Sequence, residues 1–140
     1  KIIGDMVIIH QRITIIRKSK PVEQNVNEEL LWLGDALGLF SMRDKDKSCF
    51  RVFIELLKSA KLKHPLSSDE IALKLDLTRG TVIHHINRLI DSGIVVHEGK
   101  KYLLRVSTLS ALVREVQKDL ARTFDDLAEI AEEIDQRLGL

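Results

Sequence analysis

Hydrophobic residues recur at steps of three and four along most of this sequence, and that spacing predicts a mainly helical protein. The first such segment starts at Asn27, where an asparagine cap and two acids in the first turn favour a helix, and it ends near Gly38. The second is capped by Ser48 and ends before Pro65, because a residue that precedes proline is pushed out of helical geometry.

Two shorter helices are expected next, separated by a tight turn. Ser67 and Glu70 fit a capping box, which predicts a helix over residues 68–75. Thr78 can cap the following helix, expected over residues 79–92. Two helices joined by so few residues predict a helix-turn-helix.

The second helix of this pair has two chemically different faces. At about 100° per residue, Val82, Ile86 and Leu89 fall on one apolar face, which is the predicted core side. The other face offers hydrogen-bonding groups that suit the major groove of DNA, where arginine can bind guanine and asparagine can bind adenine. With the first turn of the helix, which can also hold a phosphate, the predicted contacts are Thr78, Arg79, Gly80, Thr81, His84, Asn87 and Arg88.

A strand, a tight turn and a second strand are expected over residues 94–105, after Gly93 ends the helix. A two-stranded hairpin directly behind a recognition helix is a wing. Lys100, Lys101 and Arg105 give it positive charge, so these three residues are predicted to contact the phosphate backbone.

Residues 66–105 resemble the winged helix-turn-helix of prokaryotic transcription regulators, closest to the ArsR-like (arsenic-repressor-like) superfamily. The shared pattern is Glu70-Ile71-Ala72, Thr78, Thr81-Val82, His85, and Leu89 before Gly93. The metal-sensing branch of that superfamily uses a cysteine pair near the recognition helices. This chain has no cysteine there, which argues against a thiolate metal sensor.

The two ends of the chain add further elements. Residues 2–18 are dense in isoleucine and valine, so we expect a strand-rich arm over residues 1–20 that must pair with something larger or with a second chain. From Ser107 to Leu138, apolar residues recur at helical spacing over about 45 Å, which is longer than a winged helix can cover. The same helix of a second subunit is the expected partner, and folding back on the helix at 48–63 is the alternative.

The predicted fold is therefore mainly α with a small β component. It consists of a β arm over residues 1–20, a winged helix-turn-helix domain over 27–105 and a long dimerisation helix over 106–140. Homodimerisation is expected through residues 107–138, and the arm at 2–18 could contribute to it.

Charge is segregated along the chain although the formal net charge is only +1. Residues 78–105 carry five basic and two acidic side chains, whereas residues 106–140 carry four basic and eight acidic ones. This distribution suits a protein that meets a polyanion with part of its surface, and ordinary solvated surface is the alternative. The acidic tail is expected to project away from DNA.

Several classes of function lack support in the sequence. It has no phosphate loop, no paired carboxylates in a recognisable motif and no setting for a nucleophile, so no enzyme, catalytic residue or cofactor is expected. His84 and His85 are adjacent and cannot form the i, i+4 pair that chelates a metal, so no metal site is expected. The single cysteine and the lack of a membrane-length apolar run indicate a cytoplasmic protein.

Together these patterns predict a homodimeric transcription regulator that binds double-stranded DNA sequence-specifically. Residues 79–92 would enter the major groove and residues 94–105 would lie on the backbone. The alternative is a winged-helix module that binds other proteins without specific DNA binding.

Overall fold

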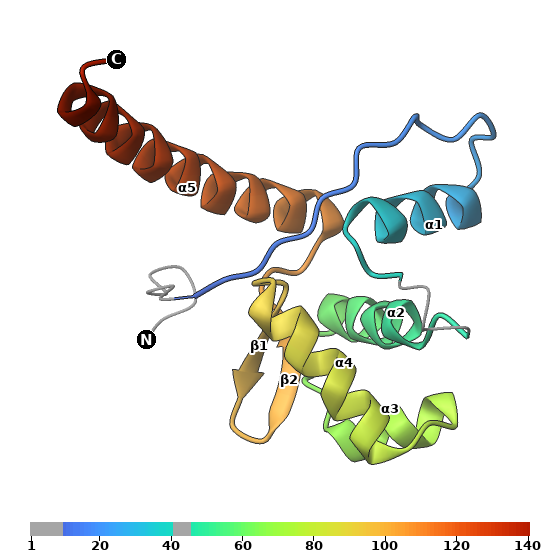
Figure 1. Cartoon of the computed structure of the whole chain (residues 1–140). Coiled ribbons are helices and arrows are strands. Elements are labelled where there is room, and N and C mark those ends of the chain that lie inside the picture. Colours follow the sequence, from blue (N-terminus) through green and yellow to red (C-terminus); the bar gives the residue numbers. More distant parts are fainter. Residues whose placement is uncertain (1–9, 41–45) are drawn as a thin grey trace.

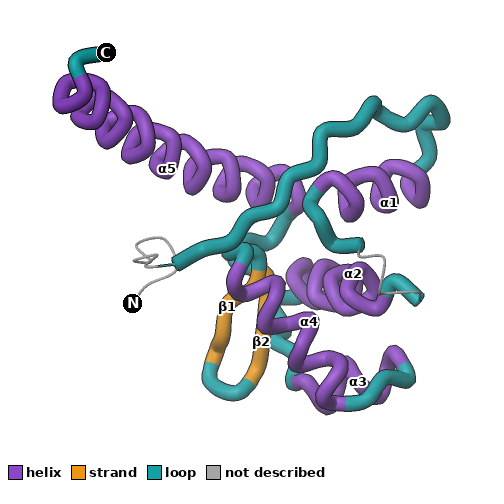
Figure 2. Tube along the Cα trace, in the orientation of Figure 1, coloured by secondary structure: helices purple, strands orange, loops and turns teal. Residues whose placement is uncertain are grey.

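The computed structural model describes residues 10–40 and 46–140. Their elements are α1 (Val26–Ala36), α2 (Ser48–Lys61), α3 (Ser68–Leu75), α4 (Arg79–Asp91), β1 (Val95–Glu98), β2 (Lys101–Leu104) and α5 (Leu109–Leu138). Figures 1 and 2 show α2, α3 and α4 gathered beside the β hairpin. Helix α1 and the long α5 lie on the side of this group that is opposite α3. The predicted mainly helical fold with a small sheet is confirmed.

The helix starts follow local capping chemistry. Ser67 and Glu70 form the predicted capping box, and the hydroxyl of Thr78 accepts from the backbone amide of Thr81 at 3.1 Å. Two predicted starts are corrected. Asn25, two residues earlier than expected, caps α1, and Ser48 is the first residue of α2 rather than its cap, which is Lys47.

The core forms where α2 packs against α3, α4 and β2. Phe53 of α2 and Ile71 of α3 are fully buried there. Val82, Ile86 and Leu89 line the buried side of α4, as the helical wheel predicted. This arrangement leaves the opposite side of α4 exposed.

The wing is an antiparallel hairpin in which Val95 pairs with Leu104 and Glu98 with Lys101. Tyr102 also exchanges two backbone hydrogen bonds with Leu66, the residue before the capping box, at 2.8 and 2.9 Å. Since Tyr102 pairs with His97, next to the turn, these bonds tie the turn end of the wing to the start of α3.

The N-terminal arm differs from its prediction. Residues 10–20 form no strand, and residues 1–9 of the predicted strand region lie outside the described residues. The amide of Arg12 donates to the carbonyl of Asp91 at 2.9 Å, and that of Ile16 donates to the carbonyl of Ala36 at 2.8 Å. The arm thus binds the carbonyl ends of α4 and α1, and Figure 1 shows it running across the molecule past the start of α5 and along the outer side of α1.

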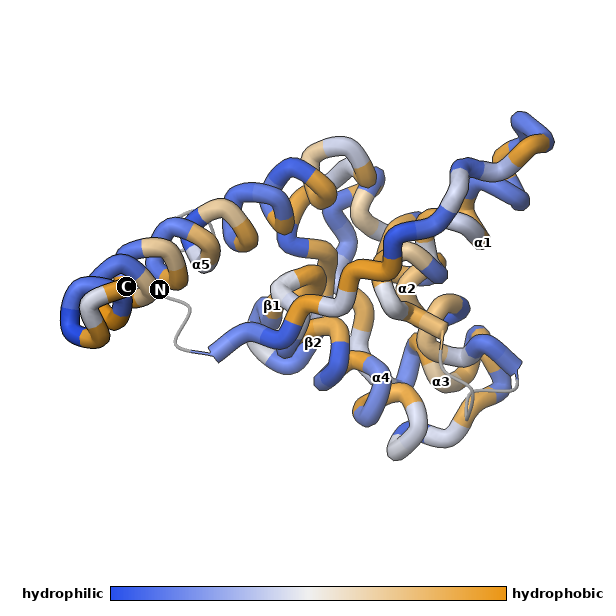
Figure 3. Tube along the Cα trace, turned by 45° about the horizontal axis from the view of Figure 1, so that its top comes forward, coloured by the Kyte–Doolittle hydropathy of each residue, from blue (hydrophilic) through white to orange (hydrophobic). Residues whose placement is uncertain are grey.

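Helix α5 packs only through its first half, where Leu112 and Val116 are buried. Every residue from 121 to 140 is exposed, so the second half does not fold back on α2. In Figure 1 it projects from the body, and Figure 3 shows hydrophobic residues recurring along it between hydrophilic ones. No helix in the described part of the chain is long and apolar enough to cross a membrane.

Candidate nucleic-acid interface

One side of α4 presents an exposed polar surface from the first turn of the helix to Asn87. Arg79 keeps 68% of its side chain exposed, and His84 and Asn87 are exposed one and two turns further along the helix. The hydroxyl of Thr78 donates to that of Thr81 at 2.8 Å, so both hydroxyls are held at the first turn. Helix N-termini carry partial positive charge and unpaired amides, which suits contact with a phosphate.

Gly80, the second residue of α4, leaves open space in the first turn of this surface. A Cβ atom placed there would meet no heavy atom within 4 Å, so packing inside this chain does not require glycine. A bare backbone does, however, allow another surface to approach closely.

We expect Gly80→Ala to separate stability from binding. Alanine removes backbone freedom from the unfolded chain, so stability should stay unchanged or rise by up to about 1 kcal/mol. The added methyl group should weaken binding to DNA, because it lies where the groove would approach. Thermal melting and DNA titration of the same variant measure both effects, and unchanged DNA affinity would show that this surface does not meet DNA closely.

Two acidic residues at the start of α3 form exposed ion pairs, one with α4 and one with the wing. Arg79 Nε lies 3.6 Å from a carboxylate oxygen of Asp69, and Lys101 Nζ lies 3.6 Å from one of Glu70. Hydrogen bonds from the backbone and side chain of Ser67, together with Lys101, lower the pKa of Glu70. Exposed pairs of this kind are weak, so a phosphate can replace either acid as the partner of the cation.

Arg88 is a correction to the predicted DNA-binding set. Its side chain is half-buried, and its Nη2 donates to the carbonyl of Gly38 at 3.1 Å. The guanidinium therefore faces the connection between α1 and α2 rather than the exposed side of α4 that holds Arg79 and His84.

Arg105 is the second correction. Only 4% of its side chain is exposed, and its guanidinium forms a double hydrogen bond with Asp119 of α5 at 2.6 and 3.3 Å. Gln11 of the arm donates to the same carboxylate at 2.8 Å and to the carbonyl of Ser92 at 2.9 Å. Arg105 therefore joins the wing to α5 and cannot present its charge to a phosphate.

We expect Asp119→Asn to destabilise the protein by about 2 kcal/mol at neutral pH. The change removes the carboxylate that forms the double hydrogen bond with the buried Arg105, and the remaining counter-charge is the Glu115 carboxylate, 3.5 Å from Nη2. Burial raises the pKa of the Asp119 carboxyl, but the hydrogen bonds from Arg105 and Gln11 and the charges of Arg105 and Arg122 lower it more, so the net shift is downward. A lowered pKa contributes stability that is present above the unfolded value of about 4 and is lost as pH falls through the folded value.

Urea unfolding at pH 7 and at pH 3 tests this prediction. The difference between the variant and the wild type should shrink at the lower pH. Asp125→Asn, an exposed acid on the same helix, is the matched control and should change stability little at either pH. Equal stability of Asp119→Asn and the wild type at pH 7 would contradict the assigned role of the pair.

The two histidines of α4 lie in different environments. His84 is exposed, whereas His85 is buried and its Nε2 lies 2.6 Å from the hydroxyl of Ser48. Sequence reasoning missed this contact, because it joins residues 37 positions apart. No group of three histidine, cysteine or acidic residues within the described segments is arranged to hold a metal ion.

Residues 57–96, from the end of α2 into β1, match the family described as winged helix-turn-helix DNA-binding. The chain carries a winged helix-turn-helix domain that is similar to this DNA-binding family over those residues. Within this domain, the side chains available to DNA are those of Thr78, Arg79, Thr81, His84 and Asn87, with Lys100 and Lys101 exposed on the wing. No curated protein and no solved structure matches the chain.

Proposed function

We propose that the protein is a homodimeric transcription regulator of the ArsR-like superfamily that acts in the cytoplasm and has no catalytic role. It binds double-stranded DNA sequence-specifically, with α4 in the major groove and the wing on the phosphate backbone. The observation that carries this proposal is the exposed face of α4, where Arg79, His84 and Asn87 follow one another along the helix and open space lies over Gly80.

The dimer is proposed from the uncovered face of α5. Leu120, Phe124, Leu127, Ala131, Ile134 and Leu138 follow one another at alternating steps of four and three, which is the spacing of a coiled-coil seam. Phe124, Leu127, Ile134 and Leu138 each expose 47–67% of their surface. A second copy of α5 would cover this stripe, and a two-fold dimer would place its recognition helices about 34 Å apart on an inverted-repeat site.

A second candidate function is supported by a different observation. The domain loses two of its predicted DNA-contacting cations, because Arg88 and Arg105 bind groups within the chain. A winged-helix module that binds other proteins needs less positive surface than a DNA-binding one. Salt dependence separates the two functions, since phosphate contacts release counterions.

The test of the proposed function is binding to selected duplex DNA between 50 and 200 mM salt. Lys100 and Lys101 supply four phosphate-contacting cations in a dimer, so affinity should fall by about 10² over this range. Lys100→Ala should weaken all sequences alike and flatten the salt slope, whereas Arg79→Ala should cost about 1–3 kcal/mol and relax specificity.

Arg137→Ala is the matched control, because this exposed arginine lies at the far end of α5. It should leave affinity and slope unchanged. Salt-independent binding, or none to any duplex recovered from a random pool, would favour the protein-binding module.

A further inference from the structure

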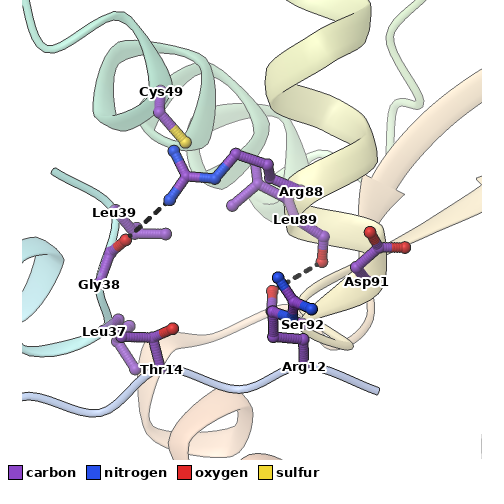
Figure 4. A pocket seen from close by; sticks show the side chains of 10 residues that line it. All are labelled: Arg12, Thr14, Leu37, Gly38, Leu39, Cys49, Arg88, Leu89, Asp91 and Ser92. Atoms are coloured by element: carbon purple, nitrogen blue, oxygen red, sulfur yellow. Dashed lines mark hydrogen bonds between the residues drawn. The ribbon is translucent and has the colours of Figure 1, made fainter. Parts of the chain in front are cut away.

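A cavity of about 360 Å³ lies on the side of α4 that faces the arm. Its walls come from four segments that are distant in sequence: the arm, the connection after α1, the start of α2 and the last turns of α4 (Figure 4). This volume is within the range of small-molecule sites in proteins. It is separate from the exposed face of α4 proposed to meet DNA.

Two guanidinium groups give the cavity its chemistry. Arg12 comes from the arm and Arg88 from α4, and Figure 4 shows them on different sides of the space. Within the described residues, neither forms an ion pair with a carboxylate, and Arg88 donates only to the carbonyl of Gly38. The carboxylate of Asp91 also lines the cavity but points away from the Arg88 guanidinium in Figure 4.

The remaining lining is of mixed character. Leu37, Leu39 and Leu89 provide apolar wall, while Thr14 and Ser92 provide hydroxyl groups. A pair of guanidinium groups binds a carboxylate well, because the fork of arginine matches its two oxygens. The leucines can bury a carbon body attached to that carboxylate.

We propose that this cavity binds a small organic carboxylate with an apolar body. The carboxylate lies between Arg12 and Arg88, and the carbon chain packs against Leu37, Leu39 and Leu89. Inorganic phosphate fits the arginines but leaves the leucines uncovered, so it should bind more weakly.

Such a ligand would contact both the arm and the recognition helix. Arg88 belongs to α4, and the arm is bonded to the carbonyl end of α4 through Arg12. Occupancy of the cavity would therefore alter the position of α4 and with it the affinity for DNA. This regulatory consequence rests on the proposed function, whereas ligand binding itself does not.

Calorimetric titration of the full chain with sodium alkanoates from butyrate to octanoate tests the site without DNA. Affinity should rise by about fourfold for each added methylene until the cavity is filled. Alkylamines of the same lengths should not bind. Arg12→Gln and Arg88→Gln should each weaken octanoate binding by roughly tenfold or more, since each removes a charged partner of the carboxylate.

Arg114→Gln is the matched control, because this exposed arginine of α5 lies outside the cavity. It should leave octanoate binding unchanged. Amide NMR shifts give a second measurement that does not depend on how well a variant folds. The signals of Gly38 and Ser92 should move on addition of octanoate, and those of the exposed residues 121–140 should stay.

The outcomes separate this proposal from the proposed function. Octanoate binding that both arginine variants retain, equal binding of amines, or shifts confined to α5 would overturn the carboxylate site. Failure of octanoate to bind the wild type at millimolar concentration would do the same, even if DNA binding is intact. Carboxylate binding by a protein that fails to bind DNA would support the site and refute the proposed function.

Discussion

Ile86→Asp is expected to unfold the domain. Ile86 is fully buried at the centre of α4, so the aspartate would lose the packing of the isoleucine and place an unpaired charge in the core. An unpaired buried charge costs several kcal/mol, against a total stability of about 5–15 kcal/mol for a typical domain. Circular dichroism during heating should show little or no cooperative transition.

Leu73→Asp is the matched control for this variant. It makes the same kind of apolar-to-acid change in the helix-turn-helix, but Leu73 is 86% exposed on α3. Its melting should stay close to that of the wild type, because exposed substitutions usually change stability by no more than about 0.5 kcal/mol. A folded Ile86→Asp protein would refute the assignment of the core face of α4.

Leu127→Glu is expected to convert the proposed dimer into monomers and to weaken DNA binding by about 10²–10⁴-fold. Leu127 lies in the middle of the exposed apolar stripe of α5, and a glutamate there would place two like charges in the seam. A monomer loses the gain from linking two half-site contacts in one complex. Sedimentation equilibrium at micromolar concentration, followed by titration of a full inverted repeat, measures both effects.

Gln136→Glu is the control, because it adds one acid to the same helix outside the stripe. This variant should remain dimeric. A wild-type protein that sediments as a monomer at micromolar concentration would exclude α5 as the dimerisation element. A Leu127→Glu protein that stays dimeric would move the interface elsewhere, including to the arm.

Local signals made much of the helix-turn-helix predictable. A capping box joins residues three positions apart, and the apolar face of α4 repeats within two turns, so both patterns are complete within a short window of sequence. Ser67, Glu70 and Thr78 were placed correctly for this reason. The length of α5 was predicted on the same grounds.

Arg88 and Arg105 show where such reasoning fails. Both were expected at DNA because exposed arginines near a recognition helix favour phosphate or base contacts. The partners that bind them lie 50 and 14 residues away, in segments whose approach depends on the tertiary fold. A helical wheel shows on which face of the helix a side chain lies, but it does not show whether another part of the chain packs against that face.

The prediction of strands in the N-terminal arm is wrong for a related reason. Isoleucine and valine favour strands because they fit a pleated sheet, but a strand also needs an edge with which to pair. In the described part of the chain, the arm meets helix ends instead of a sheet edge. The amides of Arg12 and Ile16 bind the carbonyls left open at the ends of α4 and α1.

The buried pair of Arg105 and Asp119 has a consequence for operator geometry. It bonds the end of the wing to α5, so in the proposed dimer it would restrict the distance and rotation between the two recognition helices. One inserted base pair would move a half-site by about 3.4 Å and turn it by about 35° around the duplex. A stiff connection cannot follow that change, so the protein would reject operators whose half-sites are out of rotational phase.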